Sequence, residues 1–244
     1  LDEVTQELAE AQQMQLALLP ESSPEVEGLQ IAGQNIPAKE VGGDFFDYLQ
    51  CEDQVLVAVG DVSGKGLKAA MNAVMVSGIL NLSAEYQNGI AEIMSDMNRS
   101  LCQSMERDMN VTMVLAQFDY AKRQMILANA GQHAYPLLIR NGTVEPVIAK
   151  GMALGMIPNI PYKLTTIDLE SGDLLLSMTD GITEPRNAEG VMYEESGRMN
   201  EVLTSIPIEM PIEEVLNTLI SDVEDYTTDE EQDDDITLVA VRVV

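Results

Sequence analysis

The sequence has little of the side-chain chemistry from which nucleophilic and zinc sites are usually built. Its 244 residues contain one histidine, two cysteines and no tryptophan. His133, the single histidine, cannot alone form a histidine-rich zinc site or a Ser-His-Asp triad, so we assign it a structural role in preference to metal ligation. Cys51 and Cys102 are far apart and lack a metal-binding spacing, which favours reduced thiols in a cytoplasmic protein.

Positive charge is scarce as well. The 13 lysines and arginines face 41 aspartates and glutamates, which gives a formal net charge of -28. This sign argues against binding nucleic acid or an anionic membrane by charge attraction. Most of the acidic excess is interpreted as solvated surface, but carboxylates are also the ligands that hard cations prefer.

Long apolar runs and targeting segments are missing too. We find no apolar span long enough to cross a membrane and no secretory signal. The sequence begins at Leu1 in the middle of a helical pattern, so we expect that it was cut from a longer protein.

The rest of the chain is organised around one strand, turn and helix. An apolar run from Val55 to Val59 leads into the glycine-rich turn Gly60-Asp61-Val62-Ser63-Gly64-Lys65-Gly66, and small and apolar residues follow from Leu67 to Leu82. This order predicts a buried strand, a tight turn that carries one carboxylate, and a helix.

Further aspartates lie at the margins of three other strand-like runs. They occur in Val41-Gly42-Gly43-Asp44, in Thr179-Asp180-Gly181 and in Asp233-Asp234-Asp235-Ile236-Thr237. Asp61 and Asp180 follow strands, whereas Asp44 and either Asp234 or Asp235 precede strands. Because the end of one antiparallel strand lies beside the start of its neighbour, these carboxylates can share one edge. Taken singly, each segment is most often a turn or a solvated loop.

Several aspartates on one edge would repel one another and raise each other's pKa. Bound Mg²⁺ or Mn²⁺ removes that cost, and ligands that are all oxygen suit these ions. Two such ions can activate a bridging water and neutralise phosphate oxygens, so that no protein nucleophile is needed. The pattern therefore predicts a site for divalent metal.

The secondary structure predicted from periodicity is mixed. Helices are expected over residues 1–19, 67–87, 90–105 and 213–226, and strands over 29–37, 45–49, 54–60, 113–120, 124–129, 136–140, 162–169, 174–178 and 236–244. Residues 181–200 show no clear period. Nine or ten strands are too many for one comfortable open sheet, so we expect two packed antiparallel sheets covered by helices.

The leading helix permits two interpretations. Its apolar residues follow a 3-4 spacing in which Gln15 is the one polar member, and Pro20 ends it. It is either an amphipathic helix that packs on its own domain, or a signalling helix that pairs with a second copy to form a homodimer. We divide the chain into this linker helix, residues 1–19, and one domain over residues 20–244.

Taken together, six stretches of the sequence resemble the metal-dependent PPM, or type 2C, serine/threonine phosphatases, in the bacterial SpoIIE/RsbU-like branch. They run in family order over nearly the whole chain. They are QLALLP (15–20), PAKEVGGDFFDY (37–48), GDVSGKGLKAA (60–70), NAG (129–131), GDLLLSMTDGITEPRNAEG (172–190) and DDITLVAVR (234–242).

The resemblance implies an αββα sandwich, an α+β fold of two antiparallel sheets flanked by helices, with two Mn²⁺ or Mg²⁺ ions in the cleft. It also implies hydrolysis of phosphoserine or phosphothreonine on a protein. The residue roles that it implies are as follows: Asp61, Asp180 and Asp234 are catalytic; Asp44, Asp61, the Val62 carbonyl, Asp180 and Asp234 hold metal; Lys65 and Gly181 contact substrate. Asp234 is preferred to Asp235 because the family ligand is the first aspartate of the Asp-Asp-Ile-Thr match.

The sequence departs from the family in two places. Many relatives have histidine where Lys65 stands, so Lys65 is expected either to attract phosphate or to be solvated, and the general acid stays unassigned. The eukaryotic pattern has an arginine beside the residue that matches Asp44, where it clamps phosphate, but this sequence has no arginine there. Residues 182–198 correspond to a variable flap that we associate with substrate recognition.

The branch also implies partners: a phosphorylated STAS-type anti-anti-sigma protein as substrate, and an upstream sensor that acts through the leading helix. We hypothesise that the pairing state of this helix gates metal binding. Two alternatives are kept. One is a catalytically silent partner-binding signalling module, which the intact aspartate set disfavours. The other is an acidic calcium-binding module, which the lack of EF-hand loop spacing disfavours.

Overall fold

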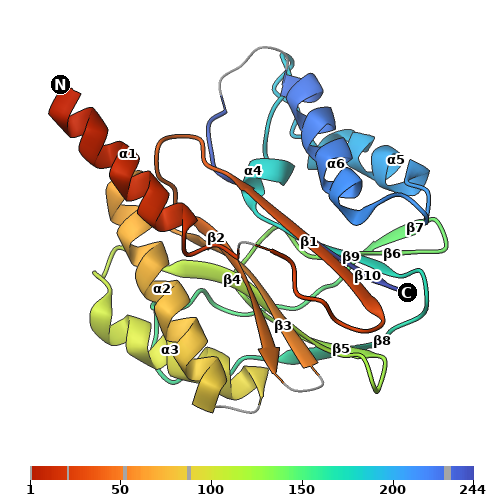
Figure 1. The fold of residues 1–244 in the computed structure, drawn as a ribbon, viewed down its shortest axis with the longest axis horizontal. Helices are drawn as coiled ribbons and strands as arrows, with labels where there is room; N and C mark the ends of the chain where they lie inside the picture. The colour runs from red at the N-terminus through yellow and green to blue at the C-terminus, as the bar shows by residue number, and fades with distance from the viewer. Residues whose placement is uncertain (1, 21, 52–53, 87–88, 228–231) are drawn as a thin grey trace.

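The structure is a computed structural model that describes residues 2–20, 22–51, 54–86, 89–227 and 232–244 (Figure 1). The helices are α1 (Asp2–Leu16), α2 (Leu67–Tyr86), α3 (Ile90–Ser104), α4 (Asp180–Thr183), α5 (Arg198–Ser205) and α6 (Ile212–Thr227), with a short 3-10 helix, η1, at Glu194–Ser196. The strands are β1 (Leu29–Ile36), β2 (Asp44–Cys51), β3 (Gln54–Val62), β4 (Val111–Asp119), β5 (Gln124–Ala130), β6 (Leu137–Arg140), β7 (Thr143–Pro146), β8 (Leu164–Asp168), β9 (Leu174–Met178) and β10 (Ile236–Val243).

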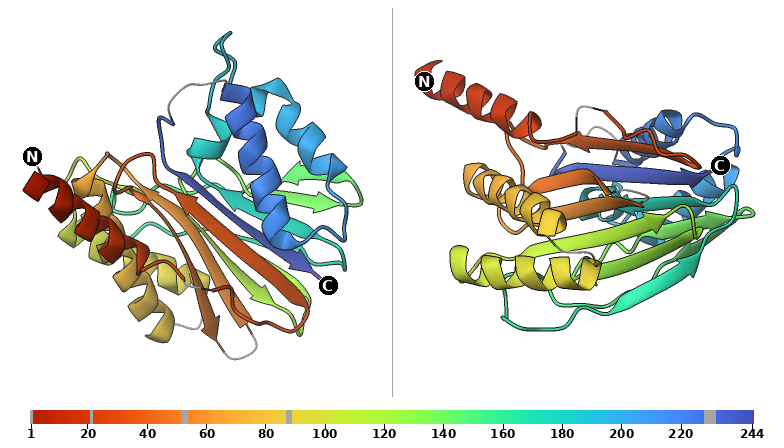
Figure 2. Two further views of the ribbon diagram at one scale, coloured as in Figure 1. Left: turned by 45° about the horizontal axis from the view of Figure 1, so that its top comes forward. Right: turned by 60° about the horizontal axis from the view of Figure 1, so that its bottom comes forward.

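These strands form two antiparallel sheets that lie face to face. One has the order β1-β10-β9-β6-β7 and the other the order β2-β3-β4-β5-β8. Helices α2 and α3 cover the outer face of the second sheet, while α5 and α6 cover the first (Figure 2). The predicted αββα sandwich is confirmed.

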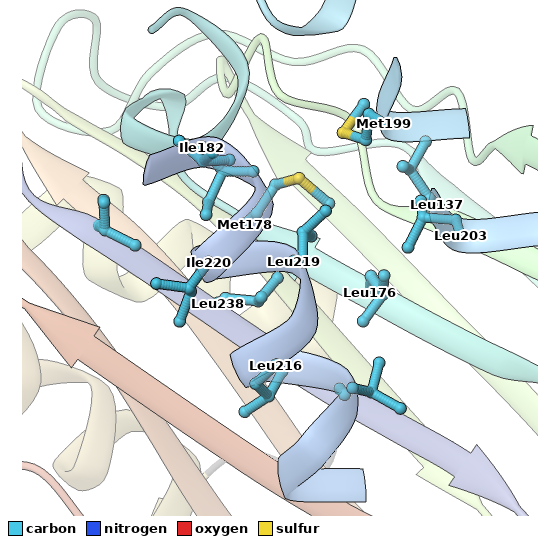
Figure 3. Packing of buried hydrophobic residues seen from close by; sticks show 14 of the residues in the cluster. Leu137, Leu176, Met178, Ile182, Met199, Leu203, Leu216, Leu219, Ile220 and Leu238 are labelled. Carbon is cyan, nitrogen blue, oxygen red and sulfur yellow. The ribbon is translucent and has the colours of Figure 1, made fainter. Parts of the chain in front are cut away.

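The core has three layers that follow from the alternation of side chains along each strand. In β10, Leu238 and Ala240 face the α5 and α6 layer, whereas Val239 and Val241 face the opposite sheet. Figure 3 shows Leu216, Leu219 and Ile220 of α6 above Leu238 and Leu176 of the sheet. Since β10 is buried on both sides, its continuous apolar run is explained.

Helix α2 contradicts the expectation that the chain has no apolar span long enough to cross a membrane. It has 20 residues with an 18-residue window of mean hydropathy 1.2, so by length and composition it could cross a membrane. The statement that no such span exists is therefore wrong. A single helix of this kind is weak support for a membrane span, because a core helix passes the same test. Here Ala73, Val76 and Leu80 are buried in the layer between α2, α3 and the sheet.

Four elements were not predicted from the sequence. The edge strand β7 is mostly exposed, so it has no apolar alternation to reveal it. Helix α5 buries Met199 and Leu203 alone, which is too few apolar residues to define a period, and α4 and η1 are single turns. Strands β8 and β9 are consecutive in the chain, yet they belong to different sheets.

Helix α1 extends away from the sandwich (Figure 1) and is attached near its C-terminal end. The Gln15 side chain donates from Nε2 to the Gly42 carbonyl at 2.6 Å, and its Oε1 accepts from the Gly42 amide at 3.2 Å. The one polar residue in the helical stripe is thus explained, because it pairs with the backbone of the β1–β2 connection.

Candidate active site

The predicted aspartates come from both sheets at one end of the sandwich. Asp44 begins β2 and lies directly opposite Asp61, the penultimate residue of β3. Asp180 follows β9, and Asp234 and Asp235 precede β10, the antiparallel neighbour of β9. The antiparallel arrangement used in the sequence argument is therefore present in each sheet.

Asp235 joins the two sheets at this edge. Its carboxylate accepts hydrogen bonds from the amides of Ala38 at 2.8 Å, Gly43 at 2.7 Å and Asp44 at 3.4 Å. Asp235 is 8% exposed, and its oxygens are occupied by backbone donors. It acts as a structural carboxylate, which is consistent with the choice of its neighbour Asp234 as the candidate ligand.

Burial and the negative charges of neighbouring aspartates disfavour the ionised form of Asp61. The pKa of its carboxyl is raised to about 7 by burial first, and then by the charges of Asp180, Asp234 and Asp235, while Lys65 acts in the opposite direction. The pKa of Asp180 is also raised, by burial and then by Asp234 and Glu184. These carboxylates are near enough to feel one another through the protein.

Asp44 is the most deeply enclosed of the set. Burial, followed by the charge of Asp61, raises the pKa of its carboxyl well above the usual value. The Thr179 hydroxyl donates to Asp44 Oδ2 at 2.6 Å and accepts from the Thr237 amide at 3.0 Å. Thr179 therefore ties β2 of one sheet to β9 and β10 of the other.

The Val62 carbonyl lies beside Asp61 in a space that glycine leaves open. A Cβ placed on Gly43 would lie 2.6 Å from Val62 O and 3.2 Å from Asp61 Oδ1. Two candidate ligand oxygens thus face one point that a side chain would fill. An oxygen-only donor set of carboxylates and a carbonyl fits Mg²⁺ or Mn²⁺.

In the described part of the chain, no three acidic, histidine or cysteine side chains are gathered tightly enough to enclose an ion as they stand. Asp234 is about half exposed, with its Oδ2 3.6 Å from Lys65 Nζ. Lys65 also donates to the Asp233 carbonyl at 3.0 Å.

A groove opens beside these residues. It has a volume of about 510 Å³, and Asp180, Gly181 and Asp234 lie at one side of it. Arg186 also lines it and is held in a tight loop by a hydrogen bond from Nη1 to the Gly190 carbonyl at 2.7 Å. Packing also requires glycine at position 181, because a Cβ there would lie 2.0 Å from the Asp235 carbonyl oxygen.

Two participants at this edge, Thr179 and Arg186, were missed from the sequence. Asp235 was considered as the alternative to Asp234, but nothing in the sequence shows that Asp235 and Thr179 form hydrogen bonds across the sheets. Arg186 supplies a cation on the groove from the segment where no periodic pattern exists. His133 is exposed and lies near Glu194, where its charge acts against the burial that raises the pKa of that carboxyl.

Comparison with solved structures places this fold in a class. The SiaA-PP2C domain of Pseudomonas aeruginosa superposes with a TM-score of 0.86 at 22% identity and covers 100% of this chain and 98% of that one. The RsbU and RsbW domains of Rv1364c from Mycobacterium tuberculosis give a TM-score of 0.81 at 25% identity over 93% of this chain and 63% of that one. The protein is an α+β PP2C-type sandwich.

Sequence comparison is more specific. The family described as Stage II sporulation protein E (SpoIIE) matches residues 52–244. The chain therefore belongs to the SpoIIE family, the bacterial branch of PP2C-type phosphatases, and the predicted resemblance is confirmed. Phosphoserine phosphatase RsbU of Bacillus subtilis is 27% identical over 98% of this chain and 71% of RsbU.

Metals are recorded for two of the structural relatives. One is RsbX in complex with magnesium, with a TM-score of 0.67 at 18% identity over 91% of this chain and 99% of RsbX. The other is the PstP catalytic domain with two manganese ions, with a TM-score of 0.63 at 17% identity over 88% of this chain and 98% of PstP. Structural relatives with this fold thus bind Mg²⁺ or Mn²⁺.

Proposed function

We propose that this chain is a metal-dependent serine/threonine phosphatase that hydrolyses phosphoserine or phosphothreonine on a regulatory protein. One observation carries the proposal: the pKa of Asp61 is raised to about 7 by burial and by the charges of Asp180, Asp234 and Asp235, and two of these neighbours, Asp180 and Asp234, line a groove of about 510 Å³. A costly group of acids at a groove is a hallmark of a functional site.

The residues that would hold two metal ions are Asp44, Asp61, the Val62 carbonyl, Asp180 and Asp234. Mn²⁺ or Mg²⁺ bound by such oxygens lowers the pKa of water and neutralises phosphate oxygens. Asp235 and Thr179 would hold the ligands in place across the two sheets. Lys65 would release Asp234 when metal binds and be free to attract the substrate phosphate.

The groove gives the substrate its path. Gly181 would let the backbone approach the phosphate, and Arg186 would contribute positive charge in a wall that is otherwise acidic. The Arg198 guanidinium binds both Asp222 oxygens at 2.7–3.0 Å, and Tyr193 donates to Asp222 at 2.7 Å. These bonds fasten the flap to α6, so that Arg186 is presented from a rigid base.

For the substrate we propose a phosphorylated STAS-type protein in the cytoplasm. The relative RsbU is a phosphoserine phosphatase, and the Rv1364c structure joins an RsbU domain to an RsbW domain. We also propose that residues 1–19 link the domain of residues 20–244 to an upstream sensor and pair with a second copy. The Gln15 bonds to Gly42, next to Gly43 and Asp44, would carry the state of that helix to the metal ligands.

The test is hydrolysis of p-nitrophenyl phosphate with Mn²⁺ added and then chelated, followed by release of phosphate from a purified phosphorylated STAS protein. Activity should require metal, and Asp61→Asn or Asp180→Asn should reduce it on the order of 100-fold or more. Asp168→Asn is the matched control, since that carboxylate is exposed at the far end of β8 and accepts from Gln124. Turnover that persists after exhaustive chelation would refute the proposal.

The competing function is a silent partner-binding module of the same fold. It predicts binding of the phosphorylated protein without phosphate release at any metal concentration. The presence of every candidate ligand at one edge favours the enzyme. Deleting residues 1–19 tests the regulatory part separately: unchanged metal dependence would remove the helix from the mechanism and leave the catalytic assignment in place.

A further inference from the structure

A second polar cavity lies at the opposite end of β10 from the aspartates. Arg242 is six residues beyond Ile236, a distance of about 20 Å along an extended strand. In Figure 1 the C-terminus and α4 mark these two ends of β10. The side chain of Arg242 lies on the α5 and α6 side of the sheet, since it alternates with Val241 and Val243, which face the other sheet.

Arg242 is a buried cation without an acidic partner. It is 4% exposed. Among the described residues, no carboxylate lies within 4.0 Å of its guanidinium, whereas Arg140, Arg198 and Arg99 each have one. Burial is the larger influence and lowers the pKa of this guanidinium, while the charge of Glu209 acts in the other direction. Burying an unpaired charge is costly, so such a group usually has a ligand.

Part of its hydrogen-bonding capacity is unused. Nη1 donates to the Met210 carbonyl and, at 3.4 Å, to Gln30 Oε1. For Nε and Nη2, no acceptor is found among the described residues, and neither is among the fully enclosed polar atoms that lack a partner. Three N–H donors therefore keep access to the space around them.

That space consists of two cavities that share Arg242 and the turn at Ser171 and Gly172. Their volumes are about 240 Å³ and about 210 Å³. Each is below the size typical of sites for drug-sized ligands, which suits a small ion better than a nucleotide. The acid of this turn, Asp173, is already engaged, because it accepts from Arg140 Nε at 2.8 Å and Nη2 at 2.6 Å.

We propose that Arg242 and the surrounding cavity form a binding site for a small oxyanion, a phosphate or a carboxylate. The fork of a guanidinium matches both groups through paired hydrogen bonds. Glu209, which lines the larger cavity, opposes the anion and sets a modest affinity. This site is separate from the proposed metal site and does not depend on its function.

The experiment is isothermal titration of the whole chain with inorganic phosphate and, separately, with acetate, against sodium chloride of equal ionic strength. Metal is first removed with EDTA and the EDTA is then dialysed away, because the chelator is itself a carboxylate; metal-bound phosphate at the aspartate edge then does not contribute. The wild-type chain should show saturable binding. Arg242→Gln should weaken it by at least about 10-fold, the scale of losing a charge-assisted hydrogen bond.

The Glu209→Gln variant should change the anion affinity in the opposite direction. It is exposed, so the fold should survive, and loss of the repelling charge should tighten binding severalfold. Arg107→Gln, an exposed arginine elsewhere, controls for net charge and should bind as the wild type does. Binding of phosphate alone assigns a phosphoryl ligand, and binding of acetate assigns a carboxylate. Failure of both anions to saturate, or equal binding by the wild type, Arg242→Gln and Glu209→Gln, would overturn the proposal.

Discussion

Replacing Asp61 by asparagine should stabilise the metal-free protein while it removes the proposed catalysis. The carboxyl has a pKa of about 7 in the folded chain against 3.8 as the ordinary value, with burial as the main cause. At about 1.4 kcal/mol per pKa unit, the difference converts to at most about 4.5 kcal/mol. The ionised side chain therefore costs the folded state up to that amount, and a neutral isosteric amide avoids it.

Because folding raises the pKa of Asp61, the stability of the wild type should depend on pH in a distinctive way. Between about pH 4 and pH 7 the folded state holds a proton on Asp61 that the unfolded state has lost, so the free energy of unfolding falls as the pH rises through this window. Above pH 7 the penalty is complete. The advantage of Asp61→Asn over the wild type should thus be small at pH 4 and largest at pH 8.

Urea unfolding in EDTA, at pH values from 4 to 8, measures the difference directly. Asp119→Asn is the control of opposite sign. Hydrogen bonds from Lys122 hold the pKa of Asp119 below its usual range, so its charge stabilises the fold above the unfolded pKa and the amide should destabilise it at pH 8. With Mn²⁺ added, the wild type should gain stability and Asp61→Asn should gain far less. A less stable Asp61→Asn at pH 8, or an advantage independent of pH, would refute the reasoning.

Four other substitutions probe the same edge. Asp234→Asn should abolish metal-dependent turnover and leave the urea midpoint nearly unchanged. Asp235→Asn should lower the free energy of unfolding by about 1.5–3 kcal/mol, because it weakens charge-assisted hydrogen bonds to backbone amides. Equal stability of the two variants would contradict the structural role of Asp235. Gly43→Ala brings a Cβ to 2.6 Å from Val62 O and should raise the Mn²⁺ concentration for half-maximal activity by about 10-fold, while Gly78→Ala, in open space on α2, should not. Gln15→Ala removes two hydrogen bonds to Gly42, so it should raise the Mn²⁺ concentration for half-maximal activity severalfold without changing turnover at saturating metal. Substitution of the exposed Gln13 by alanine is its control. An unaltered metal titration would exclude coupling through α1.

The fold was largely predictable because its main signals are local. The alternation in β2, the continuous apolar run of β3, the small residues of α2 and the apolar face of α6 can each be recognised within one segment. The pairing of Asp44 with Asp61 also follows from local structure, since β2 and β3 are consecutive antiparallel strands.

The assignment of strands to sheets was not predictable in the same way. Strand β8 alternates between exposed and half-buried residues at an edge, whereas β9 is buried throughout at the centre of the other sheet. Their separation is decided by packing between layers, and the turn between them looks like an ordinary hairpin turn. Likewise, the run Asp233-Asp234-Asp235 contains three chemically identical side chains, and only the folded chain shows which one faces backbone amides.

The two adjacent aspartates show how this edge separates folding from chemistry. The Asp235 carboxylate points inward, where it accepts hydrogen bonds from two amides of the β1–β2 connection and from the Asp44 amide, and so it links one sheet to the other. Asp234 points to the groove, where Lys65 is its nearest cation. Because the connection between the sheets is provided by Asp235 and Thr179, the carboxylates at the groove can remain mutually repulsive without opening the sandwich. Under the proposed function a divalent cation would relieve that repulsion, so that metal affinity at this edge would depend on charges that the fold tolerates but does not need.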